Sequence, residues 1–152
     1  MKLDEYDLNL LKILQFDAKT SIERLSEEVG LSSASIQRRL KRLRDKHVIT
    51  SEVAVVSPKA VGQNMTFIIS VELRRDSADC FKRFKEKINK RPRVQQCYYV
   101  TGEADFILIV TAKDMEDFDE FTQQMFFDDS NVRHFKTSVV MDRTKVSLAL
   151  PL

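Results

Sequence analysis

The chain has 152 residues, a length that fits one ordinary domain or two small ones. Hydrophobic residues make up 43% of it and charged residues 32%, which is a globular composition and excludes a disordered or collagen-like chain. The net charge of +2 indicates no partner by itself, and no apolar run approaches the ~18 residues of a membrane span, so we expect a soluble protein with no membrane partner.

The residue types that build cofactor and metal sites are scarce. Three glycines cannot form a glycine-rich phosphate loop, and Cys80 and Cys97, with His47 and His134, lack the spacing of a zinc site. We therefore expect no cofactor and no metal, and we expect reduced, partly buried thiols. Met1–Glu5 turns acidic at once, so we also expect no secretory signal and a cytoplasmic protein.

The N-terminal residues predict two short helices. Asp4, followed by Asp7, opens an apolar repeat that predicts a helix over residues 4–16. The capping-box sequence Thr20-Ser21-Ile22-Glu23 begins a second helix, and Gly30 can end it in the left-handed conformation.

A third helix follows almost directly. Ser32 or Ser33 caps it, and Ile36, Leu40 and Leu43 form its single apolar stripe. Because about three residues separate it from the second helix, the pair has the spacing of a helix–turn–helix.

Charge is segregated along this part of the chain. Residues 1–31 carry four basic and seven acidic side chains, whereas residues 32–46 carry six basic and one acidic. The outer face of the third helix is small at its start and basic further along, as an α-helix in a DNA major groove requires; the alternative is a solvated basic face. The candidate DNA-binding residues are Ser33, Ser35, Gln37 and Arg38 near the bases of double-stranded DNA, and Lys41 and Arg42 near its phosphates.

A wing and a linker are predicted next. Val48-Ile49 and Val53–Val56 are β-branched and short, which favours a two-stranded wing. Ser57-Pro58 and then Gly62 end it. We expect a winged helix–turn–helix DNA-binding domain at 1–57, a linker at 58–64 and a second domain at 65–152.

From residue 65 the hydrophobic period changes from helical to alternating. The predicted elements are a strand at Met65–Leu73, a helix with Phe81, Phe84 and Ile88 inward, strands at Val94–Val100 and Phe106–Thr111, an acidic helix with Met115, Phe118, Phe121 and Met125 inward, and a last strand with Phe135, Val139 and Met141. The order βαββαβ predicts an α+β, ferredoxin-like domain: an open antiparallel sheet with both helices on one face. The bare face needs a partner, and a twofold dimer is the simplest cover.

The loop Thr101-Gly102-Glu103-Ala104-Asp105 joins the two middle strands. It is either a hairpin turn or a ligand loop, in which main-chain N–H groups near Gly102 bind a carboxylate and Asp105 accepts from an ammonium.

Four stretches together are typical of one family. They are Leu3-Asp4-Glu5-Tyr6-Asp7, Leu25-Ser26-Glu27-Glu28-Val29-Gly30-Leu31-Ser32, Gln37-Arg38-Arg39-Leu40-Lys41-Arg42-Leu43 and Val100-Thr101-Gly102-Glu103-Ala104-Asp105-Phe106. In this order the chain resembles the Lrp/AsnC family, the feast/famine transcriptional regulators, over essentially its whole length. The resemblance implies a winged helix–turn–helix, a βαββαβ effector domain, homodimers that assemble further, usually into octamers, and a free amino acid as effector. His47 stands where the family usually has a helix-capping glycine, so we expect a left-handed backbone there.

The resemblance also favours the ligand interpretation of the loop, with a pocket between dimers that draws on the loop and the last strand. The effector-binding candidates are Thr101, Gly102, Glu103, Asp105, Thr137 and Ser138. The aromatic residues near the loop favour an apolar amino acid of the leucine or methionine kind; they are Tyr98, Tyr99, Phe106, Phe126 and Phe127.

Two other classes of function stay open. Siroheme decarboxylases look like this family in both modules yet are enzymes, and Arg133 and His134 are the candidates for such chemistry here. The third class is an interaction module with a vestigial helix–turn–helix. The basic third helix, which an enzyme does not need, favours the regulator, so we predict a DNA-binding protein without catalytic activity.

Overall fold

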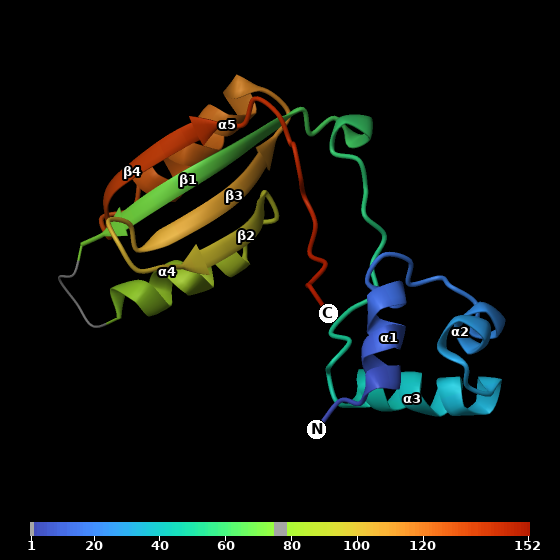
Figure 1. The fold of residues 1–152 in the computed structure, drawn as a ribbon. Helices are drawn as coiled ribbons and strands as arrows, with labels where there is room; N and C mark the ends of the chain where they lie inside the picture. Colours follow the sequence, from blue (N-terminus) through green and yellow to red (C-terminus); the bar gives the residue numbers. More distant parts are fainter. Residues whose placement is uncertain (1, 75–78) are drawn as a thin grey trace. The chain divides into compact units, whose positions relative to one another are not determined.

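The computed structural model describes residues 2–74 and 79–152, and the chain divides into two compact units (Figure 1). The first unit comprises the chain up to Val55 together with Lys145–Leu152, and the second comprises Val56–Thr144. The last eight residues, expected in the second domain, therefore cluster with the first unit. No helix in the described ranges is long and apolar enough to cross a membrane.

Three helices form the first unit, and local caps set their limits. They are α1 (Glu5–Leu14), α2 (Ile22–Val29) and α3 (Ser33–Asp45). Asp4 and Asp7 form a capping box at the start of α1, and Ser21 and Ser32 cap α2 and α3. Gly30 ends α2 at φ 72°, a left-handed conformation that glycine adopts without steric cost. The predicted helix–turn–helix is confirmed.

The stripe predicted on the third helix is the centre of a small core. Ile36 and Leu43 are fully buried and Leu40 is 4% exposed. The core side chains are Leu10, Leu14, Leu25, Val29, Ile36, Leu40 and Leu43. After α3, His47 has φ 54° and the Val48 N–H donates to the Leu43 carbonyl at 2.9 Å, which is the geometry of a Schellman cap. The left-handed conformation expected at His47 is confirmed.

The predicted wing is wrong: residues 50–57 form no strand and no helix. Arg44, in the last turn of α3, donates two hydrogen bonds of 3.0 and 2.8 Å to the Glu52 carboxylate. Hydrogen bonding by Arg44 lowers the pKa of Glu52. Val53 and Val55 are 73% and 95% exposed. The β-branched sequence indicates an extended backbone, but an isolated hairpin of so few residues is not stable without a partner.

Within the first unit, the C-terminal residues are hydrogen-bonded to the Gln15 side chain that follows α1. The Gln15 side-chain amide donates to the Leu150 carbonyl and accepts from the Leu150 N–H, both at 2.9 Å.

The second unit begins with a 3₁₀ turn, η1 (Lys59–Val61), that Gly62 ends at φ 75°. The strands are β1 (Met65–Leu73), β2 (Val94–Tyr99), β3 (Phe106–Ala112) and β4 (Val132–Val139), and the helices are α4 (Cys80–Asn89) and α5 (Met115–Thr122). The antiparallel sheet has the order β2-β3-β1-β4. Both helices cover one face, so the predicted ferredoxin-like arrangement is confirmed (Figure 1).

Alternation along the strands builds the core of this unit. Phe67, Ile69 and Val71 of β1 point to the helices and are fully buried, and Phe67 stacks on Phe118 of α5 at 3.6 Å. Met115, expected inward, is 54% exposed instead. It lies at the first position of the helix, one turn before the buried stripe begins.

α5 continues into a π-helical turn, η2 (Gln123–Phe127). The wider turn shifts the helical phase, so Met125 and Phe126 are buried whereas Phe127 is 63% exposed. β4 ends at Val139, and Met141, expected on it, lies beyond the sheet and is 93% exposed.

Candidate functional site

The outer face of α3 presents the predicted DNA-contacting residues. The exposed ones are Ser33, Gln37, Arg38, Lys41 and Arg42, and Ser35 is half-buried. The Ser35 N–H donates to the Ser32 hydroxyl at 3.3 Å, which fixes the first turn of the helix. Because the opposite stripe is buried in the core, α3 can offer only this face to a ligand.

One carboxylate holds two of the α3 arginines. Asp7 of α1 is fully buried and accepts from Arg39 Nη1 at 2.8 Å and from Arg42 Nη2 at 2.6 Å. Arg39 also donates to Asp4 at 2.7 Å, and the Asp7 N–H together with Arg39 lowers the pKa of Asp4. Arg42, predicted near phosphate, therefore has part of its guanidinium bound to α1.

Sequence reasoning missed this ion-pair network. The signal was an acidic residue, Asp7, three positions before Leu10 on the apolar face of α1. A buried carboxylate requires a cationic partner, and the basic residues of the third helix were the available source.

A cavity of about 740 Å³ lies on the open face of the sheet, beside the loop between β2 and β3. Thr101 and Glu103 of the predicted loop line it, and Gly102 has φ 118°, a conformation that favours glycine. The complete lining is Ser70, Glu72, Val100, Thr101, Glu103, Ala104, Ile107, His134 and Lys136.

The lining combines charges of both signs. In the sheet register, Glu72 is opposite His134 and Ser70 is opposite Lys136. Arg133 donates to Glu72 at 2.9 Å, so this acid is already paired. Glu103 makes no ion pair with any residue that the structure describes. An acid and a base at two sides of one cavity can bind a zwitterion.

Asp105 is not placed as an acceptor for this cavity. It is 5% exposed, its Oδ2 accepts from the Leu73 N–H at 2.8 Å, and its own N–H donates to the Val71 carbonyl at 2.9 Å. The carboxylate thus fastens the loop to the end of β1. Sequence reasoning weighed this structural role as a turn residue but assigned it to the ammonium.

Thr137 and Ser138 do not line the cavity either. Thr137 pairs with Ile69, on the helix-covered face, and Ser138 pairs with Ile68, on the open face. Successive strand residues point to opposite faces, so one small ligand cannot contact both side chains from one side.

Of the five aromatic residues expected around the ligand, two are core and none lines the cavity. Phe106 and Phe126 are 1% and 3% exposed, and Tyr99 packs edge-on against Phe81 of α4, on the helix-covered face. The cavity within one chain is therefore more polar than predicted. Its polar members Glu72, His134 and Lys136 could have been found from the period-two pattern of β1 and β4.

The cysteines and metal ligands add no further site among the described residues. Cys80 is buried and Cys97 half-buried, both unpaired, and burial raises the pKa of the Cys97 thiol. In the same ranges no three His, Cys, Asp or Glu side chains are grouped to hold a metal ion.

Comparisons with known proteins agree with this geometry. An AsnC-type helix–turn–helix domain matches residues 3–44, and the Lrp/AsnC ligand binding domain matches residues 66–150. The chain belongs to the Lrp/AsnC family, and it is a DNA-binding transcriptional regulator of that family.

The relatives are also named as regulators. An HTH-type transcriptional regulator of Sinorhizobium fredii, y4tD, is 50% identical over 152 residues, which are 100% of this chain and 90% of that protein. The DNA-binding transcriptional activator DecR of Escherichia coli is 29% identical over 99% of each chain. These names favour a regulator over the siroheme-decarboxylase alternative.

One solved structure bears on the ligand. The transcriptional regulator NMB0573 of Neisseria meningitidis, crystallised as an L-Met complex, superposes with a TM-score of 0.93. It is 31% identical, and the match covers 99% of this chain and 97% of that one.

Proposed function

We propose that this regulator changes its DNA binding or its assembly when a free amino acid binds in the cavity beside the loop at residues 101–105. The observation that carries the proposal is a cavity with charges of both signs in a family whose member NMB0573 was crystallised with L-Met. Glu103 would accept from the ammonium, and Lys136 and the Thr101 hydroxyl would donate to the carboxylate. L-Methionine and L-leucine are the first ligands to test.

The DNA contacts in this proposal come from α3. Ser33, Ser35, Gln37 and Arg38 would contact base edges in the major groove, and Lys41 would contact phosphate. Arg42 would use the donors that Asp7 leaves free. The proposed domain limits are 1–57 for DNA binding, 58–64 for the linker and 65–152 for the effector domain, whose last eight residues cluster with the first unit.

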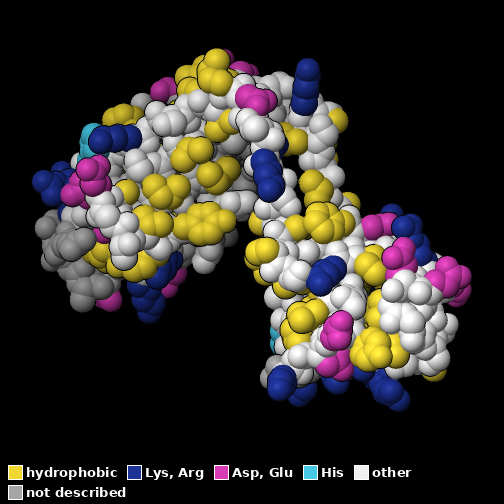
Figure 2. Space-filling view, in the orientation of Figure 1, with side chains coloured by type: hydrophobic (Ala, Val, Ile, Leu, Met, Phe, Trp, Pro, Cys, Tyr) yellow, Lys and Arg dark blue, Asp and Glu magenta, His cyan; other side chains and the backbone are white. Residues whose placement is uncertain are grey.

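Assembly is part of the same proposal. Figure 2 shows hydrophobic side chains gathered over the open face of the sheet, where Ile68 and Tyr98 are 42% and 50% exposed and Ile107 and Ile109 are half-buried. A second copy would cover this face, and the dimers would assemble further, into octamers. Light scattering at micromolar concentration tests this, since a monomer mass would contradict it. The two DNA-binding domains of a dimer would then bind an imperfect palindrome whose half-sites lie about one helical turn of DNA, or a multiple of it, apart.

Calorimetry on the full chain tests the effector site. We expect L-methionine or L-leucine to bind, and Glu103→Gln to weaken that binding by about tenfold, since one charge-assisted hydrogen bond is lost. Glu116→Gln, an exposed acid of α5 outside the cavity, is the matched control and should bind as the wild type does.

Two results would contradict the proposal. If none of the twenty amino acids raises the melting temperature or gives heat of binding, the chain has no free amino acid as effector. If Glu103→Gln and Glu116→Gln bind equally well, the site lies elsewhere.

A further inference from the structure

A second cavity lies on the other side of the sheet, on α4. It has a volume of about 440 Å³, within the usual range for small-molecule sites, and its lining is Arg83, Glu86, Lys87, Lys90 and Arg91. Four cations thus line it against one acid. Arg83 and Lys87 lie one helical turn apart on α4, and Lys90 and Arg91 follow directly after its last residue, Asn89.

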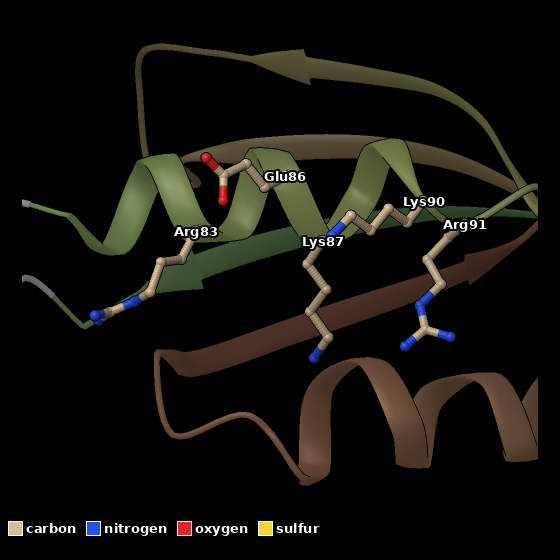
Figure 3. A pocket seen from close by; sticks show the side chains of 5 residues that line it. All are labelled: Arg83, Glu86, Lys87, Lys90 and Arg91. Atoms are coloured by element: carbon tan, nitrogen blue, oxygen red, sulfur yellow. The ribbon is translucent and has the colours of Figure 1, made fainter.

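The arrangement of these side chains is directional. Figure 3 shows Lys87 of α4 and Arg91, just after its end, extending toward the neighbouring helix, while Glu86 points away from them. Lys87 Nζ donates to the Met125 carbonyl at 2.9 Å and to the Asp129 carboxylate at 3.0 Å. Asp129 is an acid that would repel an anion, but its charge is already paired with the Lys87 ammonium.

Two of the other cations, Lys90 and Arg91, are less occupied. Arg83 donates to Asn131 Oδ1 at 3.0 Å. Lys90 has no ion pair with any residue in the described ranges. Arg91 makes no ion pair with any residue that the structure describes, although its Nε is buried from solvent.

We propose that this cavity is a binding site for a small ligand that carries a phosphate or diphosphate group. Arginine guanidinium and lysine ammonium groups are the side chains that bind phosphate oxygens, and the Nη donors of Arg91 would supply such contacts here. The ligand would contact Arg91 and Lys90 directly and would approach the paired Lys87. The site is separate from the open-face cavity and does not depend on the amino-acid effector.

Inorganic pyrophosphate is the probe, titrated calorimetrically into the full chain at about 50 mM salt, where exposed charges are weakly screened. We expect saturable binding that Arg91→Gln weakens by about tenfold, the loss of one charge-assisted contact. Lys82→Gln, an exposed cation of the same helix outside the cavity, is the control and should change the affinity by less than about twofold. Thermal unfolding of each variant confirms that it is folded.

Three results would overturn the proposal. The first is no saturable binding of pyrophosphate at millimolar concentration. The second is equal weakening by Arg91→Gln and Lys82→Gln, which would indicate only a diffuse basic surface. The third is a lower salt dependence of DNA binding in an Arg91→Gln/Lys90→Gln variant, which would assign these cations to DNA phosphates instead. Arg38→Ala, which weakens DNA binding through α3, should leave pyrophosphate binding unchanged, so this proposal and the proposed function can fail separately.

Discussion

Asp7→Asn should destabilise the DNA-binding unit more than any surface change in it. The carboxylate is fully buried between Arg39 and Arg42, whose side chains are 18% and 44% exposed. Removing one partner of a buried ion pair costs about 3–5 kcal/mol, whereas an exposed pair contributes about 0–1 kcal/mol. Arg39 keeps Asp4 as a partner, so we expect a loss of about 2–3 kcal/mol. The asparagine amide would also turn a donor toward an arginine donor.

Thermal and urea denaturation followed by far-UV circular dichroism measures this loss. For a unit of this size, about 2–3 kcal/mol corresponds to a melting temperature lower by about 10–20 °C. Glu27→Gln, an exposed acid of α2, is the matched control and should stay within about 0.5 kcal/mol of the wild type. An Asp7→Asn protein as stable as this control would refute the reasoning.

A double-mutant cycle measures how much of this loss of stability comes from the contact between Asp7 and Arg42. If Asp7 and Arg42 are coupled through the 2.6 Å hydrogen bond, the loss from Asp7→Asn/Arg42→Ala should be smaller than the sum of the single losses by about 0.5–2 kcal/mol. Strict additivity would mean that the contact between Arg42 and Asp7 contributes nothing to the free energy of unfolding.

Four further predictions concern single residues. Arg38→Ala should weaken operator binding by about 1–3 kcal/mol and relax its sequence preference, whereas Lys41→Ala should weaken binding to all DNA sequences alike and lower the slope of log affinity against log salt by about one. Anisotropy titrations over a salt series distinguish the two variants, and identical behaviour would contradict the assignment. His47→Gly should raise the free energy of unfolding by about 0.5–1 kcal/mol, because glycine relieves the left-handed strain at φ 54°; a less stable variant in urea would argue against it. Burial raises the pKa of Asp129, but the hydrogen bonds from Asn131 and Lys87 outweigh it and hold the pKa below its ordinary 3.8. The wild type should therefore lose more stability than Asp129→Asn as the pH falls from about 5 to 3. Parallel pH profiles of stability for the two proteins would be inconsistent with this. Asp105→Ala should cost about 1–3 kcal/mol by leaving the buried Leu73 N–H unpaired, and a variant as stable as the wild type would show that water replaces the carboxylate.

Local signals predicted the helices well because their causes are local. Ser21, Gly30 and Ser32 act within one helical turn of their own positions, and their identities are sufficient to place helix ends. The period-two pattern of β1 likewise predicted which residues face the core. Both depend on side chains near in sequence.

Features that depend on distant partners could not be predicted from the local sequence. Val53–Val56 has the β-branched composition of a strand, yet it forms none, because no partner strand pairs with it. The sequence shows that Asp105 carries a hydrogen-bond acceptor, and this favoured a ligand role. The N–H group that donates to it belongs to Leu73, 32 positions away, and only the fold brings the two together. Thr137 and Ser138 were taken together although alternation alone places neighbours on opposite faces.

The attachment of Asp105 to β1 has a mechanical consequence. Its N–H and carboxylate hold the main chain at Val71 and Leu73, so the loop at residues 101–105 cannot shift without dragging the end of β1. β1 extends from Leu73 back to Met65 and is hydrogen-bonded to β3 and β4 on its two sides, with a register irregularity between Glu72 and Leu73. A displacement of the loop at residues 101–105 would therefore act on one end of β1, and the residues of the proposed linker at 58–64 precede the other end.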